Sequence, residues 1–217
     1  INLTGKLSKT EKKVVSVYRS LTDRMGYSCM LNEQGVEVCF ENSVKNFGEE
    51  EYELQINPDK IKISASHYTG YFYSMVSLLQ LRELYNDSGP CGKIRDSPRF
   101  IWRGQHLDCA RHFYQVKSIL RLLDLMAFVK LNRFHWHLID DESFRLELSS
   151  FPELAEKTGL RGDGHLIPGV FGGGRGPEGG TYSAEDVKRI NEHAKSLGIS
   201  VMPEIEIPAH ANALVKV

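Results

Sequence analysis

Two adjacent carboxylates, Asp140 and Asp141, are the clearest chemical feature of the sequence, because they directly follow a segment with the period of a strand. Within residues 132–141, apolar side chains alternate with histidines, which predicts a strand with two differently lined faces. Aspartate is a poor strand residue, and packing two together raises the cost of ionising both. A functional site and a plain Asp-rich turn after a buried strand are both consistent with this stretch.

Polar side chains also follow two other segments that have strand character, and this repetition favours a site. The polar residues at the three positions are Arg111 and His112, then Asp140 and Asp141, then Glu204, Glu206 and His210. In α/β folds the carboxyl ends of the strands are where sites are built. We therefore expect these groups to meet at one edge of a sheet.

The second half of the chain alternates between strand and helix patterns after Pro98. The expected strands are residues 101–108, 132–141 and 199–206, and the expected helices are residues 116–127 and 183–197. Ser183 offers an N-cap hydroxyl, with Asp186 three residues later. This alternation predicts a parallel sheet with right-handed crossovers.

The first half has a different pattern and no obvious chemistry. We expect helices at residues 10–26 and 70–85, a strand at 36–40, and a hairpin within 52–63 that turns at Asn57-Pro58-Asp59-Lys60. Residues 86–90 have the composition of a linker. We therefore expect an α+β domain over residues 1–95 and a second domain over residues 96–217.

Composition excludes several classes of protein. The chain is 41% hydrophobic and 25% charged, as in an ordinary globular protein, and its net charge of −1 favours neither nucleic acid nor an anionic membrane surface. It contains no apolar run long enough to span a bilayer. Four separated cysteines offer no metal or redox motif.

The glycine-rich segment 172–176 lacks the ending of a phosphate loop, so we expect a mobile loop or the rim of a pocket.

Three ordered motifs resemble those of the family 20 glycoside hydrolases, the β-N-acetylhexosaminidases and chitobiases. They are Trp102-Arg103-Gly104 with residues 107–113, then residues 132–141, then residues 203–210, while residues 53–84 resemble the segment before the family's barrel. The resemblance implies a small α+β domain followed by the first three βα units of a (β/α)8 TIM barrel. Glu206 stands where the family usually has Asp, and Ala209 where it often has Gly. The motif Pro208-Ala209-His210, followed by Ala-Asn-Ala, is similar to that of bacterial chitobiases. This similarity implies a secreted, periplasmic or cell-envelope location in a bacterium.

The resemblance also implies roles for individual residues. Family catalysis is substrate-assisted, with the sugar's 2-acetamido oxygen as the nucleophile. Arg111 resembles the arginine that binds the ring hydroxyls of the terminal sugar. Asp140 and His210 resemble the pair that hydrogen-bonds towards the general acid, and Asp141 is a further supporting candidate. Arg111 could instead form a surface ion pair, and Asp140 with His210 a purely structural pair.

Other polar residues of these motifs have weaker functional implications. Glu204 is expected to belong to a polar network only. His135 and His137 are expected to be packing or barrel-polar residues, since histidines satisfied in cores outnumber ligands. The resemblance implies a carbohydrate as the substrate and no metal or cofactor.

The family's His-x-Gly-Gly-Asp-Glu motif, which supplies the acid and the acetamido-orienting Asp, is absent from the sequence. We therefore expect the chain to be the N-terminal portion of a hexosaminidase that acts on chitooligosaccharides, and to be inactive alone. Two alternatives stay open. A metal-dependent amidohydrolase-like barrel could bind zinc through His135 and His137, and a non-catalytic piece could bind carbohydrate without turnover.

Overall fold

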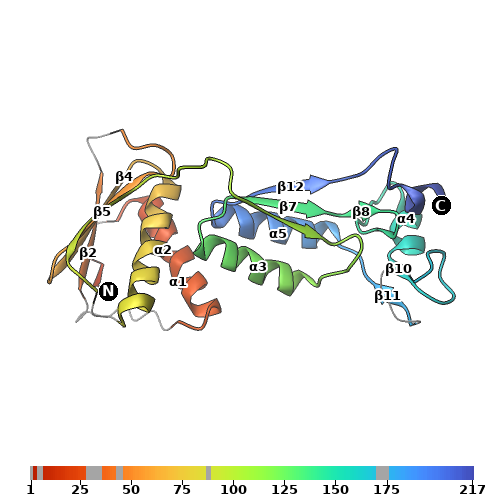
Figure 1. Ribbon diagram of the computed structural model, residues 1–217, viewed down its shortest axis with the longest axis horizontal. Helices are drawn as coiled ribbons and strands as arrows, with labels where there is room; N and C mark the ends of the chain where they lie inside the picture. Colours follow the sequence, from red (N-terminus) through yellow and green to blue (C-terminus); the bar gives the residue numbers. More distant parts are fainter. Residues whose placement is uncertain (1, 4–6, 28–35, 43–45, 87–88, 170–175) are drawn as a thin grey trace. The chain divides into compact units, whose positions relative to one another are not determined.

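The computed structural model of the protein describes all residues except 1, 4–6, 28–35, 43–45, 87–88 and 170–175 (Figure 1). The chain divides into two compact units. The first comprises Ile1–Arg103 together with Asp124–Lys130, and the second comprises Gly104–Leu123 together with Leu131–Val217.

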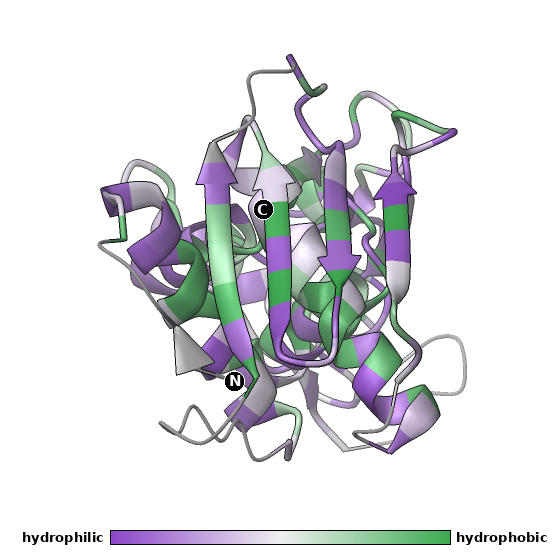
Figure 2. Cartoon of the chain, turned by 90° about the vertical axis from the view of Figure 1, so that its left-hand side faces the viewer, coloured by the Kyte–Doolittle hydropathy of each residue, from purple (hydrophilic) through white to green (hydrophobic). Residues whose placement is uncertain are grey.

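The first unit contains a five-stranded mixed sheet with the strand order β1-β2-β4-β3-β5. Its elements are β1 (Asn2–Leu3), α1 (Lys9–Arg24), β2 (Glu37–Asn42), β3 (Tyr52–Ile56), β4 (Lys60–Ala65), α2 (Tyr68–Tyr85) and β5 (Gly92–Asp96). Apolar and polar residues alternate along its longer strands, as Figure 2 shows, because one face of the sheet is buried. Helix α2 packs against β3 and β4, and α1 packs against α2.

Local sequence explains these elements. The α1 N-terminus is closed by a capping box, in which the Ser8 hydroxyl accepts from the backbone N–H of Glu11 and the Glu11 carboxylate accepts from that of Ser8. The predicted turn at Asn57-Pro58-Asp59-Lys60 joins β3 and β4 in an antiparallel pair, and the Asn57 N–H donates to the Lys60 carbonyl at 2.9 Å. Both helices and the hairpin confirm the expectations. The sequence pattern did not predict β5, where Ile94 is the only large apolar residue.

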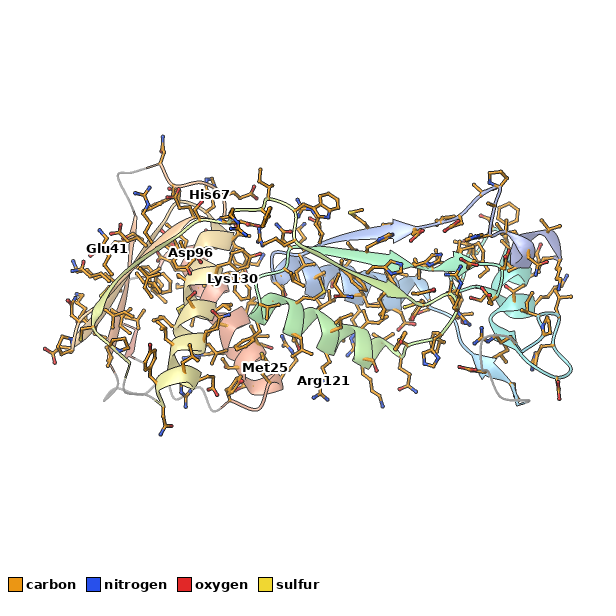
Figure 3. The ribbon with its side chains drawn as sticks, in the orientation of Figure 1. Met25, Glu41, His67, Asp96, Arg121 and Lys130 are labelled. Atoms are coloured by element: carbon orange, nitrogen blue, oxygen red, sulfur yellow. The ribbon has the colours of Figure 1, made fainter. Side chains whose placement is uncertain are left out.

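Lys130, which lies two residues after α3 (Val116–Phe128), is a mostly buried lysine within the first unit. Lys130 Nζ donates to Tyr52 Oη at 2.7 Å and to Ser77 Oγ at 2.7 Å, and it lies 2.6 Å from Asp96 Oδ2. Figure 3 labels Lys130 and Asp96. Burial raises the pKa of the Tyr52 phenol, so Tyr52 stays a neutral partner of the ammonium group.

The second unit is built on a parallel sheet with the strand order β12-β7-β6. Its strands are β6 (Gly104–Asp108), β7 (Arg133–His137) and β12 (Ser200–Glu204). Helices α3 and α5 (Ala184–Ser196) lie on the same side of it in Figure 1. The Ser183 hydroxyl caps α5 in a capping box with Asp186, as the sequence predicted. The parallel strand–helix alternation is thereby confirmed.

The strands of this sheet are shorter than the sequence pattern indicated. The first begins at Gly104 rather than at residue 101, and the third ends at Glu204 rather than at residue 206. The second ends at His137, although the Leu138 N–H still donates to the Glu204 carbonyl at 3.3 Å before a short hairpin begins. Each correction concerns residues at a strand end, where the alternation of residue types extends beyond the paired residues.

Several short elements complete the second unit. They are β8 (Ile139–Asp140), β9 (Ser143–Phe144), α4 (Pro152–Thr158), β10 (Leu160–Arg161), β11 (Glu178–Gly179) and α6 (Asn212–Val215). Strands β8 and β9 pair antiparallel and form the hairpin. Most of the glycine-rich segment 172–176, for which a mobile loop or pocket rim was expected, lies outside the described residues.

Within the part of the chain that the structure describes, no helix combines the length and apolarity needed to cross a membrane.

Candidate active site

The candidate site starts from the last residue of each strand of the parallel sheet. Asp108 is paired in register with His137, and His137 with Glu204, so the three residues form one row across β6, β7 and β12. Side chains in such a row project from the same face. Phe134 and Trp136 point to the opposite face, where they are fully buried. The alternation read from the sequence thus places polar groups on one side and the core on the other.

Arg111 lies in the turn after β6 and is surrounded by three carboxylates. Its Nη1 donates to Asp108 Oδ2 at 2.7 Å, its Nη2 lies 2.5 Å from Asp140 Oδ2, and its Nε lies 3.6 Å from Glu142 Oε2. Burial works against the charged guanidinium, but its hydrogen bond to Asp108 and the charges of Asp140 and Asp108 outweigh this and raise the Arg111 pKa. About a third of the side chain, 34%, stays exposed. Arg111 is therefore a fixed cation that a ligand can still reach.

Asp108 holds the backbone as well as the guanidinium of Arg111. Its Oδ1 accepts from the Arg111 N–H at 3.0 Å. Burial alone would raise the Asp108 pKa, but the two hydrogen bonds from Arg111 and the charge of His137 lower it below the usual aspartate value. Asp108 is thus a carboxylate at neutral pH. The sequence analysis did not select it, although its position three residues before Arg111, at the end of a strand, was a readable signal.

Asp140 is placed at the centre of the site, and His210 is placed beside it. Only 1% of the Asp140 side chain is exposed, and its Oδ2 lies 3.2 Å from His210 Nδ1 and 3.4 Å from His137 Nε2. His210 Nδ1 also lies 3.3 Å from Glu206 Oε2. The structure therefore brings together Arg111, Asp140 and His210, which the sequence analysis had named. It adds Glu206 as a neighbour of the histidine.

Asp141 faces a different partner. Its Oδ1 accepts from the backbone N–H of Asn212 at 3.0 Å, at the beginning of α6. The Asn212 side-chain amide donates to the Asp141 carbonyl at 3.4 Å. The described contacts of the Asp141 carboxylate anchor α6, while its backbone N–H donates to Asp140 Oδ1 at 2.7 Å. The side chains of the two adjacent aspartates thus have different partners, although Asp141 still supports Asp140 through its backbone.

His137 is a buried member of the site, with only 3% of its side chain exposed. Its Nδ1 lies 3.4 Å from Asp108 Oδ1, while its Nε2 lies 2.9 Å from the Ile139 carbonyl and 3.8 Å from Glu206 Oε1. Sequence reasoning expected a packing or barrel-polar residue. The sequence feature that indicates a role for His137 in the site is its position on the same strand face as the acidic residues.

Glu204 interacts with two histidines. Its Oε2 lies 2.6 Å from His135 Nε2 and 3.7 Å from His106 Nε2. Burial would raise the Glu204 pKa, but the charge of His137 and the hydrogen bonds with Glu206 and His135 lower it. Glu204 therefore stays ionised and acts as a common acceptor, in line with the network position expected for it.

Among the residues that the structure describes, two groups of side chains have ligand atoms close enough to hold a metal ion. One comprises His106, His137 and Glu204, the other His137, Asp140 and Glu206, and within each group the ligand atoms lie within 4.8 Å of one another. In the second group, the Arg111 guanidinium already neutralises Asp140 at 2.5 Å. Of the two histidines on which the zinc-dependent alternative rests, His137 belongs to both groups and His135 to neither.

Glu142 shares its environment with Asp140. Burial and a side-chain hydrogen bond with Asp140 raise the Glu142 pKa, although its own backbone N–H and the Arg111 charge act in the opposite direction. The Glu142 carboxyl group therefore holds its proton up to a higher pH than an ordinary glutamate does. This acid was not selected from the sequence, because only the fold brings it towards Arg111.

The chemistry of this arrangement suits a polyhydroxylated ligand. An arginine fork donates to vicinal oxygens, and carboxylates beside it accept from hydroxyl groups. Arg111 and Asp108 are both partly exposed, whereas Asp140 is buried behind them. The site can thus bind a sugar-like ring at Arg111 and keep a buried acidic network behind it.

Comparison with known proteins identifies the class to which this fold and site belong. Residues 100–217 match the glycosyl hydrolase family 20 catalytic domain, and residues 4–97 match domain 2 of the same family. The chain therefore belongs to glycosyl hydrolase family 20, which confirms the resemblance seen in its motifs.

Individual relatives agree with this assignment. The chain is 37% identical over 167 residues to a β-hexosaminidase of Vibrio furnissii, a match that covers 76% of this chain and 27% of that protein. It is 41% identical over 175 residues to an N,N'-diacetylchitobiase of Vibrio harveyi, covering 76% of this chain and 20% of that protein. The chain thus spans about a quarter of the length of these curated relatives.

Solved structures also resemble the chain. The GH20 exo-β-N-acetylglucosaminidase of Vibrio harveyi in complex with N-acetylglucosamine matches with a TM-score of 0.85 at 33% identity, over 99% of this chain and 34% of that one. The N-acetyl-β-hexosaminidase of Streptomyces plicatus matches with a TM-score of 0.79 at 30% identity, over 98% and 43%.

Proposed function

We propose that the protein is the N-terminal part of a β-N-acetylhexosaminidase that hydrolyses terminal non-reducing N-acetylhexosamine residues, with chitooligosaccharides as substrates. The observation that carries the proposal is Arg111, a partly exposed guanidinium held by Asp108 and Asp140 at the end of the parallel sheet. Family membership supports the reaction class. The chitobiase name of one relative and the N-acetylglucosamine bound to one structural neighbour support the substrate class.

Arg111 is proposed to bind ring hydroxyls of the terminal sugar. Its Nη1 and Nη2 are oriented by carboxylates on separate strands, so the plane of the fork is fixed before a ligand arrives. A preorganised donor loses less conformational entropy on binding than a free arginine does. A planar fork also matches two vicinal oxygens, which a lysine ammonium cannot do.

Asp140 and His210 are proposed to support the general acid through hydrogen bonds. The buried Asp140 carboxylate lies 3.2 Å from His210 Nδ1, while the histidine is about half exposed, at 49%. Such a pair can orient the imidazole and change the proton affinity of an acid placed next to it. Glu206 Oε2, 3.3 Å from the same Nδ1, would share this task.

The reaction is proposed to retain configuration at the anomeric carbon. The carbonyl oxygen of the substrate's 2-acetamido group forms a bond to that carbon while the bond to the leaving oxygen breaks, and the general acid transfers its proton to the leaving oxygen. Water then opens the cyclic intermediate. The acid and the Asp that orients the acetamido group have no counterpart motif in this sequence. They are proposed to follow Val217, on later strands of a (β/α)8 barrel whose first three βα units are β6, β7 and β12 with their helices.

Turnover assays test this proposal. The protein encoded with the residues after Val217 should hydrolyse an aryl N-acetyl-β-glucosaminide and should not hydrolyse the matched aryl glucoside without the acetamido group. The 217-residue chain alone should not turn over either substrate, since an absent general acid typically costs ~10²–10⁴ in rate. Preferential cleavage of the plain glucoside would contradict the mechanism, and turnover by the chain alone would contradict the placement of the acid.

A further inference from the structure

Arg145 is a fully buried arginine that the proposed reaction does not use. It directly follows β9, and only 1% of its surface is exposed. Among the described residues, it forms no ion pair with a carboxylate; backbone carbonyls accept its hydrogen bonds instead. An arginine buried among neutral acceptors loses its hydration without gaining a counter-ion, so such a position requires well-formed hydrogen bonds.

Its hydrogen bonds reach three separate segments of the chain. Nε donates to the Cys109 carbonyl at 2.9 Å, and Nη2 donates to the Ala110 carbonyl at 2.9 Å. Nη1 donates to the carbonyls of Gly159 at 2.6 Å and Gly180 at 3.0 Å. A lysine cannot reproduce this pattern, because its three donors radiate from a single nitrogen.

The guanidinium remains charged in this setting. Burial lowers the Arg145 pKa to about 10, partly offset by the neighbouring Tyr182. That value is still well above neutral pH. The Arg145 Cζ also lies 5.7 Å from the centre of the Phe113 ring, within the range of a cation–π contact.

Glycines make the space around this cation. A Cβ on Gly179 would lie 2.8 Å from Arg145 Nη1 and 2.2 Å from the Gly159 carbonyl oxygen, and a Cβ on Gly180 would lie 2.5 Å from the Phe113 ring. Both glycines have positive φ angles, of 143° and 156°, which side-chain-bearing residues rarely adopt. The backbone therefore approaches the guanidinium as closely as it does only because side chains are absent there.

Cys109 and Ala110 are the two residues immediately before Arg111. The segment from β8 to Arg145 thus contacts the Arg111 side chain at one end and the two residues before Arg111 at the other. Asp140 binds its guanidinium at 2.5 Å, and Arg145 binds the carbonyls of the turn from which its backbone emerges. We propose that Arg145 is a positioning residue that fixes the direction of Arg111 towards the sugar. The inference rests on the proposed function for the identity of the ligand, but not for the geometry of Arg111.

A spectroscopic experiment tests this geometry without any ligand. In nitrogen-15 NMR spectra of the 217-residue chain, the Nε–H signal of Arg111 should be dispersed and slow to exchange, because Asp108, Asp140 and Glu142 surround it. Arg145→Lys should move this signal towards that of free arginine. Arg161→Lys is the matched control, because Arg161 is also buried, at 3% exposure, and its described ion pair is with Glu178. An unmoved Arg111 signal in folded Arg145→Lys would overturn the inference.

A binding experiment connects the geometry to function. In calorimetric titrations with N-acetylglucosamine, Arg145→Lys should raise the Kd by roughly tenfold, while Arg161→Lys should leave it unchanged. A purely structural role would instead lower the fraction of folded protein, and therefore the stoichiometry, at a constant Kd. If Arg145→Lys does not fold, the same measurements are made on Arg145→Ala with added methylguanidinium. A return of the Arg111 Nε–H signal to its native position then supports the inference. A native chain that binds no N-acetylglucosamine would contradict the proposed ligand, while the NMR result would still decide the role of Arg145.

Discussion

The Arg111 guanidinium and the Asp140 carboxylate meet at 2.5 Å, with the aspartate only 1% exposed and the arginine 34% exposed. The buried partner is therefore the anion and the accessible partner is the cation. This asymmetry presents positive charge and hydrogen-bond donors to a ligand while the negative charge stays within the protein.

Arg111→Lys should weaken binding of N-acetylglucosamine by ~1–3 kcal/mol, because a point charge replaces a planar fork that bonds in two directions. Calorimetric titration of the native and variant chains measures the difference. Arg121→Lys, an exposed arginine of α3 labelled in Figure 3, is the control and should bind as the native chain does. Equal affinities of all three proteins would show that Arg111 does not contact the sugar.

Asp140→Asn should lower the free energy of unfolding by ~1–3 kcal/mol, less than the loss expected for a fully buried pair, because Arg111 is partly solvated. Urea unfolding followed by circular dichroism measures it. Asp141→Asn keeps an acceptor for the Asn212 N–H and should cost under ~1 kcal/mol. A larger loss for Asp141→Asn than for Asp140→Asn would reverse the roles assigned to the two aspartates.

Glu142→Gln should flatten the pH dependence of stability. The Glu142 pKa is raised in the folded protein, so its contribution is complete below the unfolded value near 4.5 and is lost as the pH rises through the folded pKa. The native protein should therefore lose stability relative to Glu142→Gln above pH 4.5. The Asp108 pKa is lowered, so its own loss of stability occurs at more acidic pH.

Urea unfolding across this pH range tests the Glu142 prediction. The exposed α4 residue Glu156 provides the control, and Glu156→Gln should reproduce the native profile. A native minus Glu142→Gln difference that stays constant with pH would show that Glu142 has an ordinary pKa.

Lys130→Met should destabilise the first unit by ~1–3 kcal/mol, since it removes the donor shared by the buried Tyr52 and Ser77 hydroxyls and the partly exposed Asp96 carboxylate. Thermal unfolding followed at tyrosine wavelengths measures the effect. Lys93→Met breaks only the exposed pair with Glu53 and should cost ~0–1 kcal/mol. Similar losses for both variants would contradict the importance of the buried network.

Zinc titration separates the hydrolase proposal from the metal-dependent alternative. We expect no stoichiometric binding, because Glu204 Oε2 already lies 2.6 Å from His135 Nε2 and Asp140 is neutralised by Arg111. Calorimetry with zinc chloride provides the measurement. A one-to-one site that disappears in His106→Ala would favour the alternative.

The sequence predicted the elements with strong periodicity. Helices α1, α2, α3 and α5, the Asn57–Lys60 turn and the parallel strand–helix alternation all follow from alternating or helical patterns of apolar residues. Strand β5 was missed, because Ile94 alone gives no pattern and the strand depends on pairing with β3. The short elements between β8 and β11 were missed for a related reason, since two-residue strands carry no period.

The candidate site was predictable only in part. Arg111, Asp140 and His210 were named through motifs, and the structure places all three together. Arg145 was not named, since its function depends on carbonyl groups, which no side-chain pattern reveals. Asp141 shows the opposite case, because adjacency in sequence suggested a pair while the chain turns its carboxylate towards Asn212.

The register of β7 determines which of its side chains enter the core and which reach the polar face of the sheet. Trp136 occupies the helix-covered face and His137 the polar face, so inserting or deleting one residue within Arg133–His137 would exchange them. Trp136 would then meet solvent at the proposed sugar site, and His137 would enter the core without its acidic neighbours. A substitution that keeps the alternation changes either the core packing or the polar face of the strand, whereas a change in length removes both together. Evolution of this site can therefore proceed through residue identity but not through the length of this strand.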